Sequence, residues 1–339
     1  MAQGLAAPAT KQNTIVPAGF YISSISDERM VSDSTGTLLF STNGKSVTHK
    51  IILEGATFKG IKSTLLAAVA KDISLRPLSI RVKECSITEI LTGKDRVSGE
   101  ISLILMFDLL TESGLVPLTP YKSHTKYTRD LSDLSSVKPA LQTVLVNSLK
   151  FVNNWIDIQA PNNPQLAKGV RLTFRDYIEQ HDDTVYYSPS RPLTWDDFRE
   201  KRSEEKFAAS VFPSFGYDQT TKMEGGIIDI QLLVKVYMVK SASWVGAASR
   251  TKYNLDHEQK HFELVKIVAE RFKKKLLSEK LTVENYLGII NFEYIESYRD
   301  MNKLQQEYDE QTSHGTSKVF QEIWNKKVET ELAKFRADD

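Results

Sequence analysis

The chain has 339 residues, 41% of them hydrophobic and 26% charged, a composition typical of a soluble globular protein long enough for two domains. Its 44 basic and 43 acidic residues leave a formal net charge of +1, so no excess of positive charge points to nucleic acid. The sequence contains no run of about eighteen apolar residues, so no transmembrane segment is predicted. Its single cysteine, Cys85, excludes both an intrachain disulfide and a multi-cysteine zinc site.

Residues 1–14 are small and polar and show no periodicity, so this start is predicted to be disordered. It lacks the basic stretch and apolar core of a signal peptide, which taken literally indicates a cytoplasmic protein. However, Ala2-Gln3 followed by small residues looks like the beginning of a mature exported chain behind an added Met. We therefore expect a periplasmic or secreted protein if a signal peptide has been trimmed, and a cytoplasmic one otherwise.

Residues 15–158 are predicted to form an α+β domain with a mostly antiparallel sheet and two helices. Asn43-Gly44 is a hairpin signal between two of its strands. The domain contains no cluster of chemically reactive side chains, so its role is open, and binding of a protein partner is a hypothesis. Strands are predicted over 19–26, 37–41, 46–54, 79–90, 99–110 and 121–129, and helices over 58–72 and 137–156.

Residues 159–182 are predicted to be a linker followed by a connecting strand over 170–178, and residues 183–339 a second domain. Thr194 is predicted to cap a short helix. The pair Asp196-Asp197 then belongs to its first turn and is no catalytic pair, because sequence neighbours do not face each other on a helix. Strands are predicted over 207–217 and 227–239, and long helices over 253–276, 283–311 and 316–335.

The first of these long helices contains His257-Glu258-Gln259-Lys260-His261, which matches the H-E-x-x-H pattern. Residues four apart lie one turn apart on a helix, so both histidines could bind one zinc ion, with Glu258 as general base for the attacking water. The apolar face that starts at Leu264 continues backward through both histidines, which predicts that they are buried. The alternatives are a solvated helix with two incidental histidines, or two buried histidines with ordinary hydrogen-bond partners.

A catalytic zinc normally takes three protein ligands and a water, so a third ligand is expected after this helix. His314 is predicted as that ligand, because imidazole is a common zinc ligand and Gly315 permits a tight turn beside it. Asp309 is the alternative, and whichever of the two does not bind the metal could orient a ligating histidine. A third possibility is that Asp309 only caps its helix and His314 is an exposed loop residue.

Further candidates surround these residues. Tyr308, Tyr253 and Arg299 are candidates for stabilising the oxyanion of the transition state. Tyr308 and Glu263 are also candidates for orienting a metal-binding side chain by a hydrogen bond, without binding the metal themselves. An ordinary surface glutamate would explain Glu263 equally well.

Three motifs occur in order in the second half of the chain: Pro192–Phe198, Asp256–Glu263 and Tyr308–Gly315, the last followed by Gln321 and Trp324. Over about Val185 to Leu332 the chain resembles a bacterial family catalogued as domain of unknown function nine hundred and twenty-two, regarded as candidate secreted zinc peptidases. That family often has glycine where Lys260 stands, a position that binds no metal. The resemblance implies a metallopeptidase-like site but no particular substrate, and it leaves the first half uncovered.

The sequence thus predicts an α+β protein whose C-terminal domain is zincin-like, with the H-E-x-x-H helix and two further long helices. The expected cofactor is Zn²⁺ and the expected substrate a peptide or protein. Two rival hypotheses remain. One is a zinc-binding envelope or interaction protein without hydrolytic activity, and the other is an interaction scaffold without metal.

Overall fold

The computed structural model describes residues 15–17, 19–30, 37–42, 45–50, 54–201 and 207–338. The chain divides into two compact units, an N-terminal unit ending at Leu166 and a C-terminal unit starting at Ala167. The division falls inside the 159–182 segment, and each unit combines helices with sheet, which confirms the predicted α+β class. The predicted disordered start and the Asn43-Gly44 turn lie outside the described residues.

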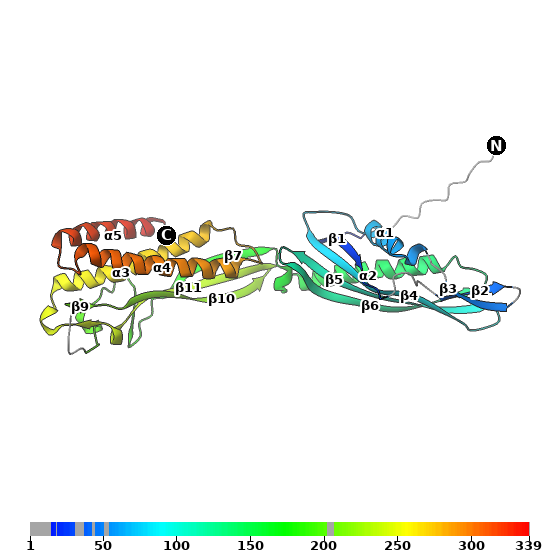
Figure 1. The fold of residues 1–339 in the computed structure, drawn as a ribbon, viewed down its shortest axis with the longest axis horizontal. Coiled ribbons are helices and arrows are strands. Elements are labelled where there is room, and N and C mark those ends of the chain that lie inside the picture. The colour runs from blue at the N-terminus through cyan, green and yellow to red at the C-terminus, as the bar shows by residue number, and fades with distance from the viewer. Residues whose placement is uncertain are drawn as a thin grey trace, which may run out of the picture. The chain divides into compact units, whose positions relative to one another are not determined.

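The N-terminal unit contains a six-stranded sheet in the order β3-β2-β4-β5-β6, with β1 also paired to β4. The β2–β3, β4–β5 and β5–β6 pairs are antiparallel, whereas β1 and β2 run parallel to β4, so the predicted mostly antiparallel sheet is confirmed. Two helices accompany the sheet (Figure 1). The elements are β1 (Phe20–Asp27), β2 (Thr37–Thr42), β3 (Lys45–Lys50), α1 (Phe58–Ala68), β4 (Arg76–Leu91), β5 (Arg96–Thr111), β6 (Gly114–Asp130) and α2 (Val137–Gln159).

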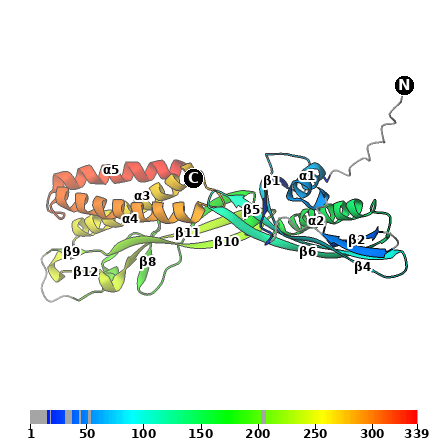
Figure 2. The ribbon, with the colours of Figure 1, turned by 45° about the vertical axis from the view of Figure 1, so that its right-hand side comes forward.

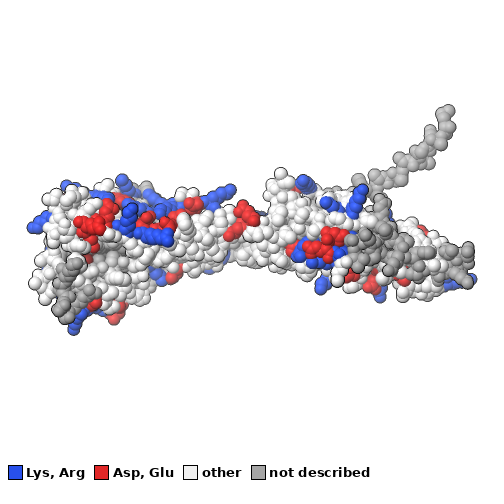
Figure 3. All heavy atoms as spheres, in the orientation of Figure 1, with Lys and Arg blue, Asp and Glu red and all other residues white. Residues whose placement is uncertain are grey.

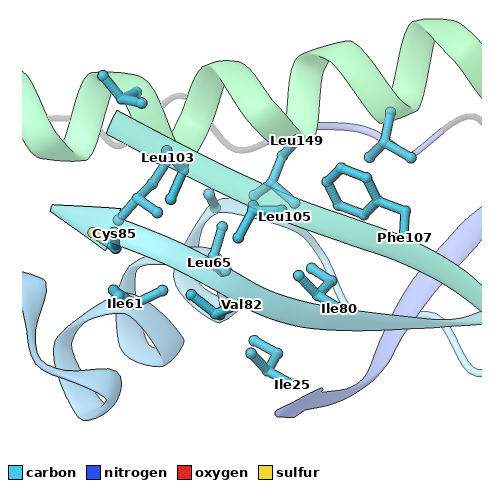
Figure 4. Packing of buried hydrophobic residues seen from close by; sticks show 14 of the residues in the cluster. Ile25, Ile61, Leu65, Ile80, Val82, Cys85, Leu103, Leu105, Phe107 and Leu149 are labelled. Atoms are coloured by element: carbon cyan, nitrogen blue, oxygen red, sulfur yellow. The ribbon is translucent and has the colours of Figure 1, made fainter. Parts of the chain in front are cut away.

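The core of this unit lies between the sheet and its helices. Alternate side chains of β4 and β5, such as Val82 and Leu105, point to one face and meet Leu149 of α2 and Leu65 of α1 (Figure 4). Cys85 belongs to the same buried cluster, where it packs as a small apolar residue.

A buried ion pair ties three strands of this sheet together. Arg129 on β6 donates to both carboxylate oxygens of Glu89 on β4, at 2.7 and 2.6 Å. The same two side chains also hold β2, because Leu39 donates its N–H to Glu89 and accepts from Arg129 at its carbonyl. Both charges are almost completely buried, so their mutual pairing is what makes the burial tolerable.

The C-terminal unit contains a sheet in the order β10-β11-β7, with β8 on β11, and a separate two-stranded β9–β12 pair. Its three long helices cover one face of the larger sheet (Figures 1 and 2). The predicted strand over 170–178 is β7, which runs parallel to β11 and so belongs to this unit. The elements are β7 (Gly169–Asp176), β8 (Thr184–Tyr186), β9 (Ala209–Ser210), β10 (Pro213–Glu224), β11 (Ile227–Val239), β12 (Trp244–Val245), α3 (Lys252–Ser278), α4 (Tyr286–Thr312) and α5 (Lys318–Asp338).

The prediction of one continuous strand over 207–217 is wrong. The chain leaves β9 after Ser210 and enters β10 at Pro213, crossing from the small sheet to the large one. At the crossing, the N–H groups of Val211 and Phe212 donate to the side chains of Glu258 and Ser243 and not to a strand. These side chains satisfy the backbone where the ladder is interrupted.

Helix α3 is the centre of the C-terminal unit. One side, including Phe262, Val265 and Phe272, packs on the alternating apolar face of β11. The opposite side, through Leu264 and Ile267, packs on α4 and α5. The apolar residues of these two sides form one wide face of an amphipathic helix, which explains its clear sequence signal.

The ends of the helices follow local capping. Thr251 precedes α3, and its hydroxyl accepts from the Asn254 N–H at 3.1 Å. Thr282 accepts from the Asn285 N–H at 3.2 Å, but α4 begins at Tyr286, because the residues that follow Thr282 form a turn. Thr194 and Asp197 form the predicted cap of a short 3-10 helix, and Arg191 holds the Asp197 carboxylate.

Acidic and basic side chains are intermixed over the helices of the C-terminal unit on the face drawn in Figure 3. Within the part of the chain that the structure describes, no helix is both long and apolar enough to cross a membrane.

Candidate metal centre

Three potential metal ligands converge between α3 and α4. The Nε2 atoms of His257 and His261 lie 3.4 and 3.0 Å from the same oxygen, Oδ1 of Asp309. One donor atom from each residue lies within 4.8 Å of the others, and both histidines are buried. The structure thus brings together the two histidines of the H-E-x-x-H pattern and the alternative third ligand.

His314, the first choice for the third ligand, lies outside this group of three. Its side chain is half exposed, its Nδ1 is 3.7 Å from the outer oxygen of Asp309, and its ring lies 4.5 Å from that of Phe207. Helix α4 ends just before it, and Ser313, His314 and Gly315 all have positive φ. The chain therefore turns away at this point, whereas Asp309 still lies on the last turn of the helix that faces α3.

The outer nitrogens of both imidazoles are held by glutamine amides. His257 Nδ1 lies 2.8 Å from Oε1 of Gln321, and His261 Nδ1 is hydrogen-bonded to Oε1 of Gln305. A carbonyl oxygen only accepts, so each Nδ1 carries a proton and donates to its glutamine. The Nε2 atom of each ring then points to the space beside Asp309, where it can meet either that carboxylate or a metal ion.

Charge in the cluster is balanced locally. Burial opposes ionisation of Asp309, but hydrogen bonds and charge from the two imidazoles outweigh it and hold the pKa of that carboxyl well below its usual range. Burial likewise opposes protonation of His261, yet the neighbouring Asp309 carboxylate raises the pKa of its ring. A proton or a cation between these groups is therefore strongly favoured.

Glu258 lies beside the cluster and is almost completely buried. Its Oε2 accepts the backbone N–H of Val211 at 2.8 Å, which holds the carboxyl in place. Burial raises the pKa of this carboxyl, while the adjacent histidines act in the opposite direction. A carboxylate with a raised pKa is suited to accept and hold a proton.

These groups open into one cavity of about 300 Å³. Its remaining walls are the segment from Phe207 to Pro213 on one side and Met301, Asn302 and Gln305 of α4 on the other. Apart from the cluster residues, Glu258 and His314, the lining carries no ionisable side chain among the described residues.

The other candidates from the sequence lie around the cavity but do not line it. The Tyr308 hydroxyl is buried against Gln321 and the His257 carbonyl, and its ring stacks on His257. Arg299 is exposed and paired with Glu296, and Tyr253 lies under the ammonium group of Lys318. Tyr308 is thus placed to orient His257, whereas the other two do not reach the cavity.

Glu263 contacts neighbouring residues of α3 and is not part of the cluster. Its two oxygens accept from Lys260 at 2.6 Å and from Gln259 at 3.1 Å. Sequence reasoning missed Gln305 as a partner of His261 and noted Gln321 only as part of a motif. The available signal for Gln305 was its spacing of four from Asp309, which places both on one face of α4.

The donor set fits a zinc ion. Two imidazole nitrogens and one carboxylate oxygen, with an open cavity beside them, make up the ligands of a catalytic zinc site. The same donor types also bind ferrous iron in other proteins, so identification of the metal requires elemental analysis.

No family model matches the sequence, and no curated protein matches it. The resemblance to the domain of unknown function nine hundred and twenty-two therefore stays a prediction.

Several solved structures are similar to part of the chain. A Xanthomonas campestris protein of the domain of unknown function 330 family is 14% identical, with 46% of this chain and 92% of that chain covered and a TM-score of 0.23. An uncharacterized protein is 10% identical, with coverages of 42% and 95% and a TM-score of 0.25. A minor lipoprotein from Acinetobacter baumannii is 12% identical, with coverages of 41% and 94% and a TM-score of 0.23. Similarity this low carries no conclusion about the site.

Proposed function

We propose that the C-terminal unit is a zincin-like metallopeptidase that hydrolyses a peptide bond. The observation that carries the proposal is the convergence of two Nε2 atoms and one carboxylate oxygen beside a buried glutamate in a single cavity. Such an arrangement of metal donors and a general base is what metal-assisted hydrolysis needs.

His257, His261 and Asp309 would hold the zinc, which when bound supplies Lewis acidity and lowers the pKa of water. Glu258 would accept the proton of the attacking water and later return it to the leaving amine. The Val211 N–H keeps the Glu258 carboxyl fixed during both transfers, so the base needs no reorganisation.

The walls of the cavity favour a polypeptide substrate. In the β9–β12 pair, the Gly246 N–H donates to the Ala208 carbonyl, and Ser210 lies opposite Trp244. Hydrogen-bonded positions alternate along an antiparallel strand, so the N–H and C=O of Ala209 face the other edge, along the cavity. An extended peptide could add to this edge and run past the metal donors.

The rest of the described lining is neutral or apolar, with Asn302, Met301 and Phe212 bordering the cavity. An uncharged backbone with apolar side chains fits such walls.

The test starts with elemental analysis for zinc and iron on the wild type, on His257→Ala and on the control variant His124→Ala, whose exposed histidine lies in the N-terminal unit. We expect about one zinc per chain in wild type and control and none in His257→Ala. Wild-type protein that neither contains zinc nor takes it up on titration would remove the enzyme proposal and leave the scaffold hypothesis.

A peptidase screen then separates an enzyme from a zinc-binding protein without activity. Glu258→Gln should retain zinc, because Glu258 is not one of the converging donors, but should lose turnover. A wild type that binds zinc yet cleaves none of a broad library of unstructured peptides would favour the non-hydrolytic alternative. The secreted location implied by the resemblance and a protein partner for the N-terminal unit remain predictions, which fractionation and pull-down of the native protein would test.

A further inference from the structure

We propose that Gln305 and Gln321 are positioning residues whose amides hydrogen-bond Nδ1 of His261 and His257 and thereby turn both Nε2 atoms toward Asp309. This inference deepens the proposed metal site. Its central statement, the orientation of each ring, concerns the protein itself and can be tested whether or not the protein is a peptidase.

The hydrogen bonds of Gln305 determine the orientation of its amide. Its Nε2 donates to the backbone carbonyl of His261 at 2.9 Å, and a carbonyl cannot donate in return. The amide oxygen must therefore be the atom that meets the His261 ring, and an oxygen there requires a proton on Nδ1. Gln305 thus hydrogen-bonds the backbone carbonyl of His261 through its amide nitrogen and the His261 ring through its amide oxygen.

Gln321 holds His257 from α5. Its Oε1 lies 2.8 Å from His257 Nδ1 and 3.0 Å from the Tyr308 hydroxyl, while its Nε2 donates to that hydroxyl at 2.6 Å and to Asn325 Oδ1 at 3.0 Å. Tyr308 also stacks on the His257 ring, with 4.7 Å between the ring centroids. Gln321 is almost completely buried, so the amide has no water with which to exchange these partners.

Both acceptors are neutral amides. A carboxylate in the same place would add a negative charge to a cluster that already holds Asp309 and Glu258. With amides, the rings are oriented without that charge, and Asp309 is the one anionic donor of the group. The two glutamines come from α4 and α5, so correct packing of both helices on α3 is what aims the ligands.

The test uses Gln305, because it is only partly buried and its replacement should leave the fold intact. Gln305→Met keeps the length but loses the strong acceptor, whereas Gln305→Glu keeps an acceptor and loses the donor. Gln306→Met and Gln306→Glu serve as matched controls, since Gln306 is the next residue on α4, is exposed, and donates its amide to Glu310. Zinc dissociation constants are measured by competition with a chromophoric chelator, and the His261 Nδ1–H proton is followed by long-range ¹⁵N–¹H correlation on metal-free protein.

We expect a hydrogen-bonded, slowly exchanging Nδ1–H on His261 in wild type, in Gln305→Glu and in both controls, and its loss in Gln305→Met. Zinc binding should weaken by about 10–100-fold in Gln305→Met and much less in Gln305→Glu. An unchanged Nδ1–H signal and affinity in Gln305→Met would overturn the proposal, and so would equal losses in Met and Glu variants, which indicate a purely structural role. If wild type shows the hydrogen-bonded Nδ1–H but binds no zinc, the positioning role stands and the proposed function fails.

Discussion

Replacing Gly315 with alanine tests whether the turn between α4 and α5 supports His257. Gly315 has a φ of +77°, and a Cβ added there would lie 3.1 Å from Cγ and 3.2 Å from Nδ1 of the His257 ring. These distances are shorter than the roughly 3.5–4.0 Å of an ordinary carbon contact. The alanine would therefore push the ring away from its hydrogen bond to Gln321.

Two costs can be separated with a control. Placing a Cβ in the left-handed region costs about 1–2 kcal/mol of folding stability. Gly315→Ala and the control Gly225→Ala share this cost, because Gly225 has a φ of +59°. The control adds no steric contact, since nothing lies within 4 Å of its added Cβ. For a unit of this size each kcal/mol lowers Tm by about 2–4 °C. Only Gly315→Ala should add displacement of His257, which we expect to weaken zinc binding by about tenfold or more.

The assay combines thermal unfolding with zinc competition on both variants. Comparable falls in Tm together with a zinc defect confined to Gly315→Ala would support the argument. Equal zinc affinities in the two variants would refute it, because the His257 ring would then not depend on the turn. A zinc defect in Gly225→Ala would also refute it, since that glycine does not touch the site.

Two further predictions concern the buried Glu89–Arg129 pair and the third metal ligand. Glu89→Gln should destabilise the N-terminal unit by about 3–5 kcal/mol at neutral pH, measured by urea unfolding, because it leaves Arg129 buried without its partner. Burial opposes ionisation of Glu89, but hydrogen bonds from Arg129 and Tyr127 outweigh it and lower the pKa of its carboxyl. The stabilisation from the ionised carboxylate is therefore present above the ordinary glutamate pKa and is lost as the pH falls through the lowered pKa. The difference in unfolding free energy between wild type and variant should accordingly shrink in acid. Asp309→Ala should abolish tight zinc binding and His314→Ala should not, and calorimetric titration showing the reverse would restore His314 as the third ligand.

Local signals predicted the part of the site that lies on one helix. The period of Leu264, Val265, Val268 and Phe272 predicts an amphipathic helix, and these residues are buried in α3. Extending that period backward predicts burial of His257, which the structure confirms. Spacing within a single helix is sufficient here, because backbone geometry alone puts residues four apart on one face.

Contacts between helices were harder to predict. Periodicity in the sequence of α4 predicts an apolar line that includes Leu287, Ile295 and Tyr298, yet these three are exposed by 50%, 51% and 40%. The residues of that line that are buried, Ile290, Met301 and Tyr308, define the narrower face that meets α3 and α5. Hydrophobicity cannot rank two neighbouring faces of a helix that are both partly apolar, because packing against a partner decides between them.

The same limit applies to the third ligand. Asp309 and His314 follow α3 at almost the same distance in sequence, and zinc chemistry admits either one. What separates them is that α4 continues through Asp309 and ends before His314, where the backbone turns left-handed. The break between β9 and β10 has a similar origin, because Val211 gives its N–H to Glu258, a residue far away in sequence.

The metal donors and their supports come from three helices that share one core. Tyr308 packs with Trp324 of α5 and Ile267 of α3 in the same apolar cluster, and its hydroxyl reaches the glutamine that orients His257. Packing that core therefore also sets the geometry of the candidate ligands. Zinc binding at the proposed site should raise the stability of the unit by mass action. Mutations that loosen the α4–α5 packing should weaken metal binding even when they touch no ligand.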